Sequence, residues 1–179
     1  MLFAPFRLLG AAVLGLAACQ SHPDKPPATA SPAPHRPPLP EPRLVTHALG
    51  RSGYSVALPA DYSLKSTDAA DFQVYYFASA DTLSRHYFTG GLYFGTQPQG
   101  PDSTTADCQV RRQPATLLGR PATWHVTRCA SGYTVHALFD SHSGRGWDAQ
   151  INAFGEARSA AELRQLLAVF ATLRREVKP

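Results

Sequence analysis

The sequence predicts an α+β fold, in which an antiparallel β-sheet is covered by a C-terminal amphipathic helix. Two observations predict it. Between residues 43 and 154, short stretches with alternating apolar and polar residues are separated by glycine-rich turns, as in antiparallel sheets. Residues 159–177 instead carry apolar side chains at spacings of three and four, which is the period of a helix that buries one face.

Residues 1–18 have the pattern of an export signal. Arg7 precedes an apolar run from Leu8 to Leu16. This run of about nine residues is too short to span a bilayer, which takes roughly twenty. We therefore expect a signal peptide here.

The residues Leu16, Ala17, Ala18 and Cys19 resemble the bacterial lipobox, in which the cysteine is joined to diacylglycerol and becomes the first residue of the mature protein. The resemblance implies a lipidated Cys19 and attachment to a membrane of the cell envelope, facing the periplasm. Gln20 is not the aspartate that retains lipoproteins at the inner membrane in enteric bacteria, so the outer membrane is favoured. The alternative is an ordinary signal peptide with a chance cysteine.

Residues 19–42, which begin with the lipidated cysteine, are predicted to be a disordered tether. Proline recurs through His22–Pro42, and Leu39 is the only large apolar residue there. Such a segment cannot bury enough surface to offset its ordering entropy. At about 3.1 Å per residue in a polyproline conformation, it reaches roughly 60 to 70 Å from the bilayer. A plain spacer is the simpler interpretation, and a ligand for an aromatic groove is the alternative.

Residues 43–179 have the length of one globular domain, and its strands are expected in the following order. A hairpin joins residues 45–49 to residues 54–58. Residues 72–78 and 86–96 form aromatic strands, and Gly90–Gly91 splits the second of them by a bulge or tight turn. After a turn at residues 117–121, a hairpin joins residues 122–129 to residues 133–139, and residues 147–154 form the last strand.

The chain then changes period. Ser159 and Glu162 have the spacing of a capping box, in which each side chain accepts a hydrogen bond from the other residue's backbone N–H. The apolar stripe that follows consists of Leu163, Leu166, Leu167, Phe170, Leu173 and Val177. We expect this stripe to lie on the sheet. The alternative is a helix on the membrane surface.

Three stretches carry a resemblance to a known family: GYSVALPADY near the start of the domain, LLGRPATWHV in its middle and FATLRRE at its end. With this order of elements, they resemble the PsbP-like α/β/α sandwich found in several bacterial lipoproteins. The resemblance implies the fold but says little about activity. In that family the domain mostly binds other proteins, and there is no general catalytic set to carry over.

Cys108 and Cys129 are the remaining cysteines. In an oxidising compartment, two cysteines in one domain predict a disulfide. Closing a loop of about twenty residues stabilises the fold by roughly 3 kcal/mol in the chain-entropy model. The alternative, a metal or redox pair, lacks any Cys-x-x-Cys spacing.

His125 and His136 are weak candidates for metal ligands. If Ala130 faces Tyr133 in the hairpin, the two imidazoles project from one face at diagonal positions, with Cβ atoms about 7 to 8 Å apart. Zinc takes three or four ligands, and the sequence identifies no third. We therefore expect no metal and no cofactor, and two ordinary hydrogen-bonded histidines.

No catalytic set is recognisable. The segment Asp140–Gly144 contains the residue types of a hydrolase triad, but adjacent residues in a turn cannot align a nucleophile, base and orienting group, so a polar loop is expected. The net charge of +4 is spread along the chain, which is typical of a solvated surface and not of a nucleic-acid site. We expect no enzyme.

Two hypotheses for the function follow. The first is a non-enzymatic envelope lipoprotein that binds a protein partner through a sheet edge or aromatic loops. Its specific versions are an immunity protein that blocks a toxin in the periplasm, and a secretion or envelope accessory factor. The alternative is a periplasmic lipoprotein that binds a small ligand or a metal, with Tyr75, Tyr87, Tyr93 and the two histidines near a pocket.

Overall fold

The computed structural model describes residues 42–81, 87–98, 107–141 and 146–176. The predicted signal segment, Cys19 and almost all of the predicted tether lie outside these residues. The described residues form β1 (Leu44–Ala48), the 3-10 turn η1 (Gly50–Ser52), β2 (Tyr54–Pro59), β3 (Tyr62–Asp68), β4 (Phe72–Ser79), β5 (Phe88–Gly95), β6 (Gln109–Leu117), β7 (Arg120–Cys129), β8 (Gly132–Asp140), β9 (Gln150–Ala157), α1 (Ala160–Ala171) and β10 (Arg174–Arg175).

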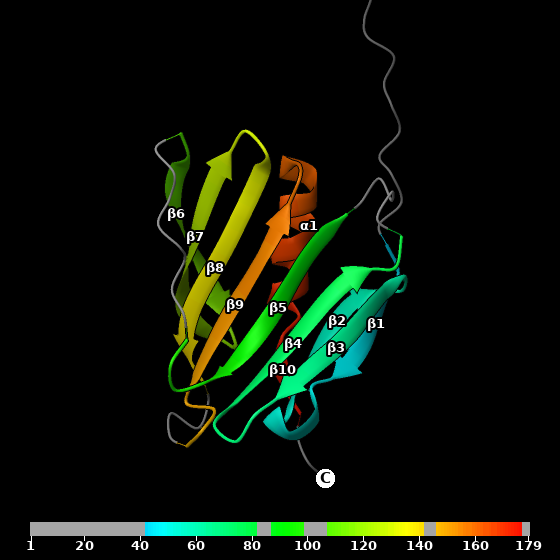
Figure 1. The fold of residues 1–179 in the computed structure, drawn as a ribbon, viewed down its shortest axis with the longest axis vertical. Coiled ribbons are helices and arrows are strands. Elements are labelled where there is room, and N and C mark those ends of the chain that lie inside the picture. Colours follow the sequence, from blue (N-terminus) through cyan, green and yellow to red (C-terminus); the bar gives the residue numbers. More distant parts are fainter. Residues whose placement is uncertain (1–41, 82–86, 99–106, 142–145, 177–179) are drawn as a thin grey trace, which may run out of the picture. The chain divides into compact units, whose positions relative to one another are not determined.

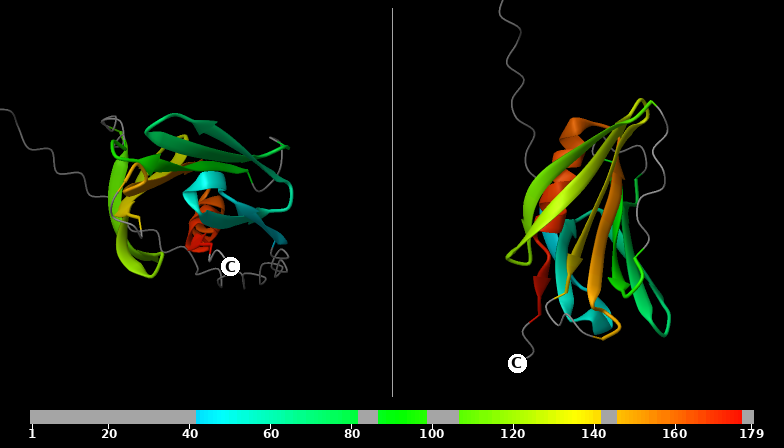
Figure 2. Two further views of the ribbon diagram at one scale, coloured as in Figure 1. Left: turned by 90° about the horizontal axis from the view of Figure 1, so that it is seen from below. Right: turned by 90° about the vertical axis from the view of Figure 1, so that its left-hand side faces the viewer.

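These strands form two antiparallel sheets. The larger sheet has seven strands in the order β3-β4-β5-β9-β8-β7-β6, and the smaller has three in the order β1-β2-β10 (Figure 1). Helix α1 and the three-stranded sheet lie on the same side of the seven-stranded sheet (Figure 2). We call that side of the large sheet its inner face and the opposite side its outer face.

The predicted α+β fold, a PsbP-like α/β/α sandwich, is wrong. Strands make up 61% and helices 13% of the described residues, so the fold is largely β. Two stretches without a strong apolar pattern, β3 and β6, are strands that widen the sheet. The layer that covers the inner face combines one helix with the small sheet, and no described helix covers the outer face.

The predicted break at Gly90–Gly91 is also wrong, because β5 runs without interruption from Phe88 to Gly95 and pairs with β4 and β9 throughout. The two glycines make room for aromatic rings. A Cβ atom on Gly90 would lie 2.6 Å from Cζ of Phe77, and one on Gly91 would lie 2.5 Å from Cζ of Phe154. Glycine is therefore required by packing on both faces of the strand.

Helix α1 begins with the predicted capping box and packs on the inner face. The side chain of Ser159 accepts from the backbone N–H of Glu162, and the Glu162 carboxylate accepts from that of Ser159. The ring of Phe170 lies between Phe77 of β4 and Trp124 of β7, with centroid separations of 5.6 and 5.2 Å. These contacts place the apolar stripe in the core.

The helix ends at Ala171, before the end of the apolar spacing. Thr172 then joins it to the small sheet, since its Oγ1 accepts from the backbone N–H of Ala57 in β2 at 2.8 Å. Leu173 is buried, and Arg174–Arg175 pairs with β2 as strand β10. Within the described ranges, we find no helix with both the length and the hydrophobicity needed to span a bilayer.

Candidate functional site

The hairpin between β7 and β8 places His125 directly opposite His136. Cys129 pairs with Gly132, so the connecting loop consists of Ala130 and Ser131. The predicted diagonal arrangement is wrong. It assumed that Ala130 pairs with Tyr133, which places the turn one residue too late, and a register error of this kind changes every partner in a hairpin. Both imidazoles project from the outer face.

The two imidazole rings stack on each other. Their centroids are 4.6 Å apart with an interplanar angle of 27°. Burial lowers the pKa of His136, and the nearby His125 lowers it further. The described residues contain no cluster of three metal-ligating side chains. The cross-strand neighbours of the pair are Arg112 on β6 and Phe154 on β9, neither of which is a usual zinc ligand.

The histidine pair belongs to a longer line of residues across the sheet. Each strand contributes one residue to this line, and each of these residues is paired directly with the one on the neighbouring strand. From one edge of the sheet to the other they are Lys65, Tyr76, Gly91, Phe154, His136, His125 and Arg112. We call these seven residues the outer-face row. It carries a cation at each end and aromatic rings between them.

The aromatic part of the row is continuous across Gly91. The rings of Tyr76 and Phe154 approach each other edge to face, with centroids 5.9 Å apart, because the intervening glycine has no side chain. Tyr76 is 49% exposed, although it is one of the largest apolar residues of the sheet. Leu138 and Val110, also on the outer face, are 49% and 53% exposed. Large exposed apolar groups gathered on one face are typical of an interaction surface.

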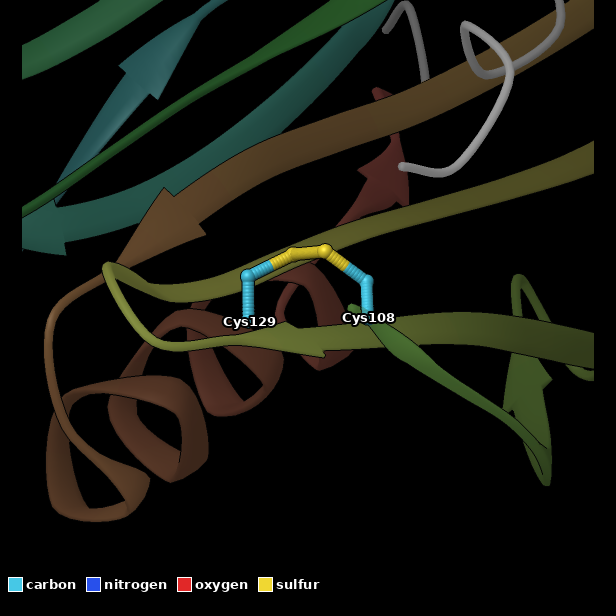
Figure 3. The surroundings of a disulfide bond; sticks show 2 residues. All are labelled: Cys108 and Cys129. Atoms are coloured by element: carbon cyan, nitrogen blue, oxygen red, sulfur yellow. A yellow bond between two sulfur atoms is a disulfide. The ribbon is translucent and has the colours of Figure 1, made fainter. Parts of the chain in front are cut away.

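The disulfide between Cys108 and Cys129 holds one end of this face. The bond is present in the structure, as the cysteine count predicts. It joins the residue before β6 to the last residue of β7, next to the β7–β8 loop (Figure 3). The cross-link therefore fixes the edge strand that carries Arg112 to the strand that carries His125.

A separate pocket of about 450 Å³ lies between β1–η1 and β3–β4. Its lining consists of Ala48, Gly50, Arg51, Leu64, Ser66, Asp68, Gln73 and Tyr75. The buried hydroxyl of Tyr75 donates to the backbone oxygen of Leu49, and burial raises the pKa of this phenol. The Gln73 side chain donates from Nε2 to Asp68.

The predicted ligand-binding residues do not lie together. Tyr75 lines the pocket, whereas Tyr93 and the two histidines lie on the outer face. Tyr87 lies outside the lining and under the guanidinium of Arg158, whose Cζ is 4.3 Å from the ring centroid.

Two of the predicted site features lie beyond the described residues. They are Cys19 and residues 142–144 of the Asp140–Gly144 loop. The sequence did not indicate Arg51, Asp68 and Gln73, because the turn η1 and the strands β3 and β4 line one pocket only in the folded protein. No protein-family model, curated protein or solved structure matches this chain.

Proposed function

We propose that this chain is a non-enzymatic, lipid-anchored protein of the bacterial cell envelope that binds a protein partner through the outer-face row. The anchor is the lipidated Cys19 that the lipobox resemblance implies. The observation that supports partner binding is the row itself, in which exposed and half-buried aromatic rings lie between Lys65 and Arg112.

The size of the row suits a protein partner. Seven neighbouring strands span six spacings of about 4.8 Å, or roughly 29 Å. A standard interface buries about 800 Å² on each partner, which corresponds to a patch of similar width. Tyrosine, phenylalanine and arginine are the residues that interface cores favour. The row therefore has both the dimensions and the composition of such a patch.

The charges of the row define the partner. Lys65 and Arg112 lie at opposite edges of the sheet, so the complementary surface is an apolar centre with a carboxylate on each side. Glu156 and Asp140 lie on the same face in other rows, which restricts the orientation in which such a partner docks. We therefore infer a protein partner with an aliphatic patch between acidic residues.

The experiment that tests this proposal is site-specific photocrosslinking in native envelopes. A photoreactive amino acid replaces Tyr76 in the full-length, lipidated chain, and the same group at Val45 is the matched control. Val45 is 40% exposed but lies on β1 of the small sheet. We expect one protein adduct from position 76, none from position 45, and loss of the adduct in Cys19→Ala.

The captured protein is then purified and titrated against defined variants. Tyr76→Ala and Leu138→Asp should each weaken binding at least tenfold, since interface anchors contribute about 2 kcal/mol or more, and Val45→Asp should leave it unchanged. Equal adducts from both positions, no adduct, or adducts only with further copies of this chain would contradict the proposal.

A further inference from the structure

The pocket between β1–η1 and β3–β4 contains two opposite charges that do not pair with each other. Arg51 and Asp68 both line it, and no ion pair joins them in the described part of the chain. The Nη2 atom of Arg51 donates to the backbone oxygen of Ala69 at 2.8 Å. Its guanidinium also lies over Trp147, 4.3 Å from the ring centroid. A guanidinium has five N–H groups, so these contacts hold Arg51 in place and leave donors for a ligand.

Gln73 lines the pocket and holds Asp68 in place. Gln73 is only 4% exposed, and its Nε2 is occupied by Asp68. Its Oε1 is buried and has no hydrogen-bond partner. Since Nε2 of this buried amide donates to Asp68, Gln73 fixes the position of the Asp68 carboxylate in the lining.

We propose that this pocket binds a small zwitterion of the amino-acid type. The ligand carboxylate pairs with Arg51, since guanidinium groups bind carboxylates in a bidentate manner. The ligand ammonium pairs with the Asp68 carboxylate, which Nε2 of Gln73 holds in place. An aliphatic ligand side chain lies against Leu64, the largest aliphatic residue of the lining.

The charge balance of the lining favours a zwitterion over other small ligands. A simple anion would meet the Asp68 carboxylate, and a simple cation would meet the Arg51 guanidinium. The two formal charges sum to zero, so a ligand with separated charges and no net charge matches both. The volume of about 450 Å³ lies within the range of small-molecule sites, roughly 300 to 1,000 Å³. This site shares no residue with the outer-face row, so the proposal of a small ligand is independent of the proposal of a protein partner.

The test uses the full-length chain, purified in mild detergent, and four probes at millimolar concentration. L-Leucine carries both charges, N-acetyl-leucine lacks the ammonium, leucinamide lacks the carboxylate, and glucose represents an uncharged polyol. Binding is measured by calorimetry and by the NMR shift of the Gln73 side-chain amide. We expect leucine to bind and to shift that amide, and the two blocked forms to bind at least tenfold more weakly.

Charge-removing variants locate the site. Asp68→Asn and Arg51→Gln should each weaken leucine binding at least tenfold. Asp71→Asn and Arg128→Gln make the same changes at exposed positions outside the pocket and should have no effect. Melting temperatures of all four variants check that they fold. Preference for glucose, no shift from any zwitterion, or undiminished leucine binding by Asp68→Asn would overturn the proposal.

Discussion

His125 and His136 stack at opposing positions of β7 and β8, so that one imidazole forms much of the environment of the other. Burial is the larger cause of the lowered pKa of His136, and the charge of His125 is the smaller. Replacing His125 removes the second cause and leaves the first. The pKa of His136 therefore reports whether the two histidines face each other in this hairpin.

We predict that His136 titrates below its ordinary value of 6.5 in the folded protein, as followed by NMR of the imidazole protons. His125→Gln should raise the pKa of His136 but leave it below 6.5, because burial remains. The folded-state pKa is depressed, so this histidine contributes stability above pH 6.5 that is lost as the pH falls through the folded-state value. A midpoint at or above 6.5 would show that His136 is not buried as described.

Tyr62 should resist ionisation. Its hydroxyl accepts from the backbone N–H of Phe88 at 3.1 Å, and burial raises the pKa of this phenol from 10.0 to about 12. Since the folded-state pKa is raised, the associated stability is complete below pH 10 and is lost between about pH 10 and 12. Ultraviolet titration should find one tyrosine that ionises near pH 12.

Removing the Tyr62 hydroxyl should remove that late-titrating group. Tyr62→Phe should also lower the free energy of unfolding by about 1 to 3 kcal/mol, because the N–H of Phe88 loses its acceptor inside the protein. Tyr76→Phe is the matched control, since Tyr76 is 49% exposed. An unchanged late titration in Tyr62→Phe would assign it to another tyrosine.

Glu162 should be a larger determinant of stability than a surface carboxylate. Its Oε2 accepts from the backbone N–H groups of Arg158 and Ser159, both at 2.9 Å, and its Oε1 accepts from that of Tyr87 at 3.2 Å. Glu162→Ala should lower the free energy of unfolding by about 2 kcal/mol or more, measured with urea. Glu156→Ala, at an exposed position of β9, should change it by less than about 0.5 kcal/mol.

The disulfide should stabilise the edge of the large sheet. Cys108 and Cys129 are separated by 21 residues, and opening a loop of this length costs about 3 kcal/mol in the chain-entropy model. The variant with both cysteines changed to serine should lose this amount, and a reductant should then have no further effect. A stability that responds equally to reductant in both proteins would point to another cause.

The central strands were predictable from sequence, whereas the edges of the large sheet were not. A strand with neighbours on both sides and one buried face alternates clearly, as β8 (Gly132–Asp140) does. The edge strands β3 and β6 each have one neighbour, and most of their residues are exposed. Pro114 lies within β6, a position that only edge strands tolerate. Edge strands carry polar residues and prolines to discourage further pairing, and this removes the pattern on which prediction depends.

The candidate sites were predictable only in part. The sequence placed both histidines on one face of one hairpin, but its register depends on a loop that is one residue earlier than expected. The pocket was not predictable, since Arg51 lies in the turn η1 before the small sheet's central strand and Gln73 lies in β4 of the large sheet. Local patterns contain no information on such contacts.

The three-stranded sheet constrains the order of folding. Its central strand β2 pairs with β1 on one side and with Arg174–Arg175 on the other, and Thr172 adds a hydrogen bond to Ala57 of the same strand. Thr172 and Ala57 are 115 positions apart in the chain. Contacts this distant form late and slowly. A nascent chain emerging in order cannot complete its small sheet until these residues have been released, so β2 keeps an open edge during synthesis, when aggregation is the competing fate.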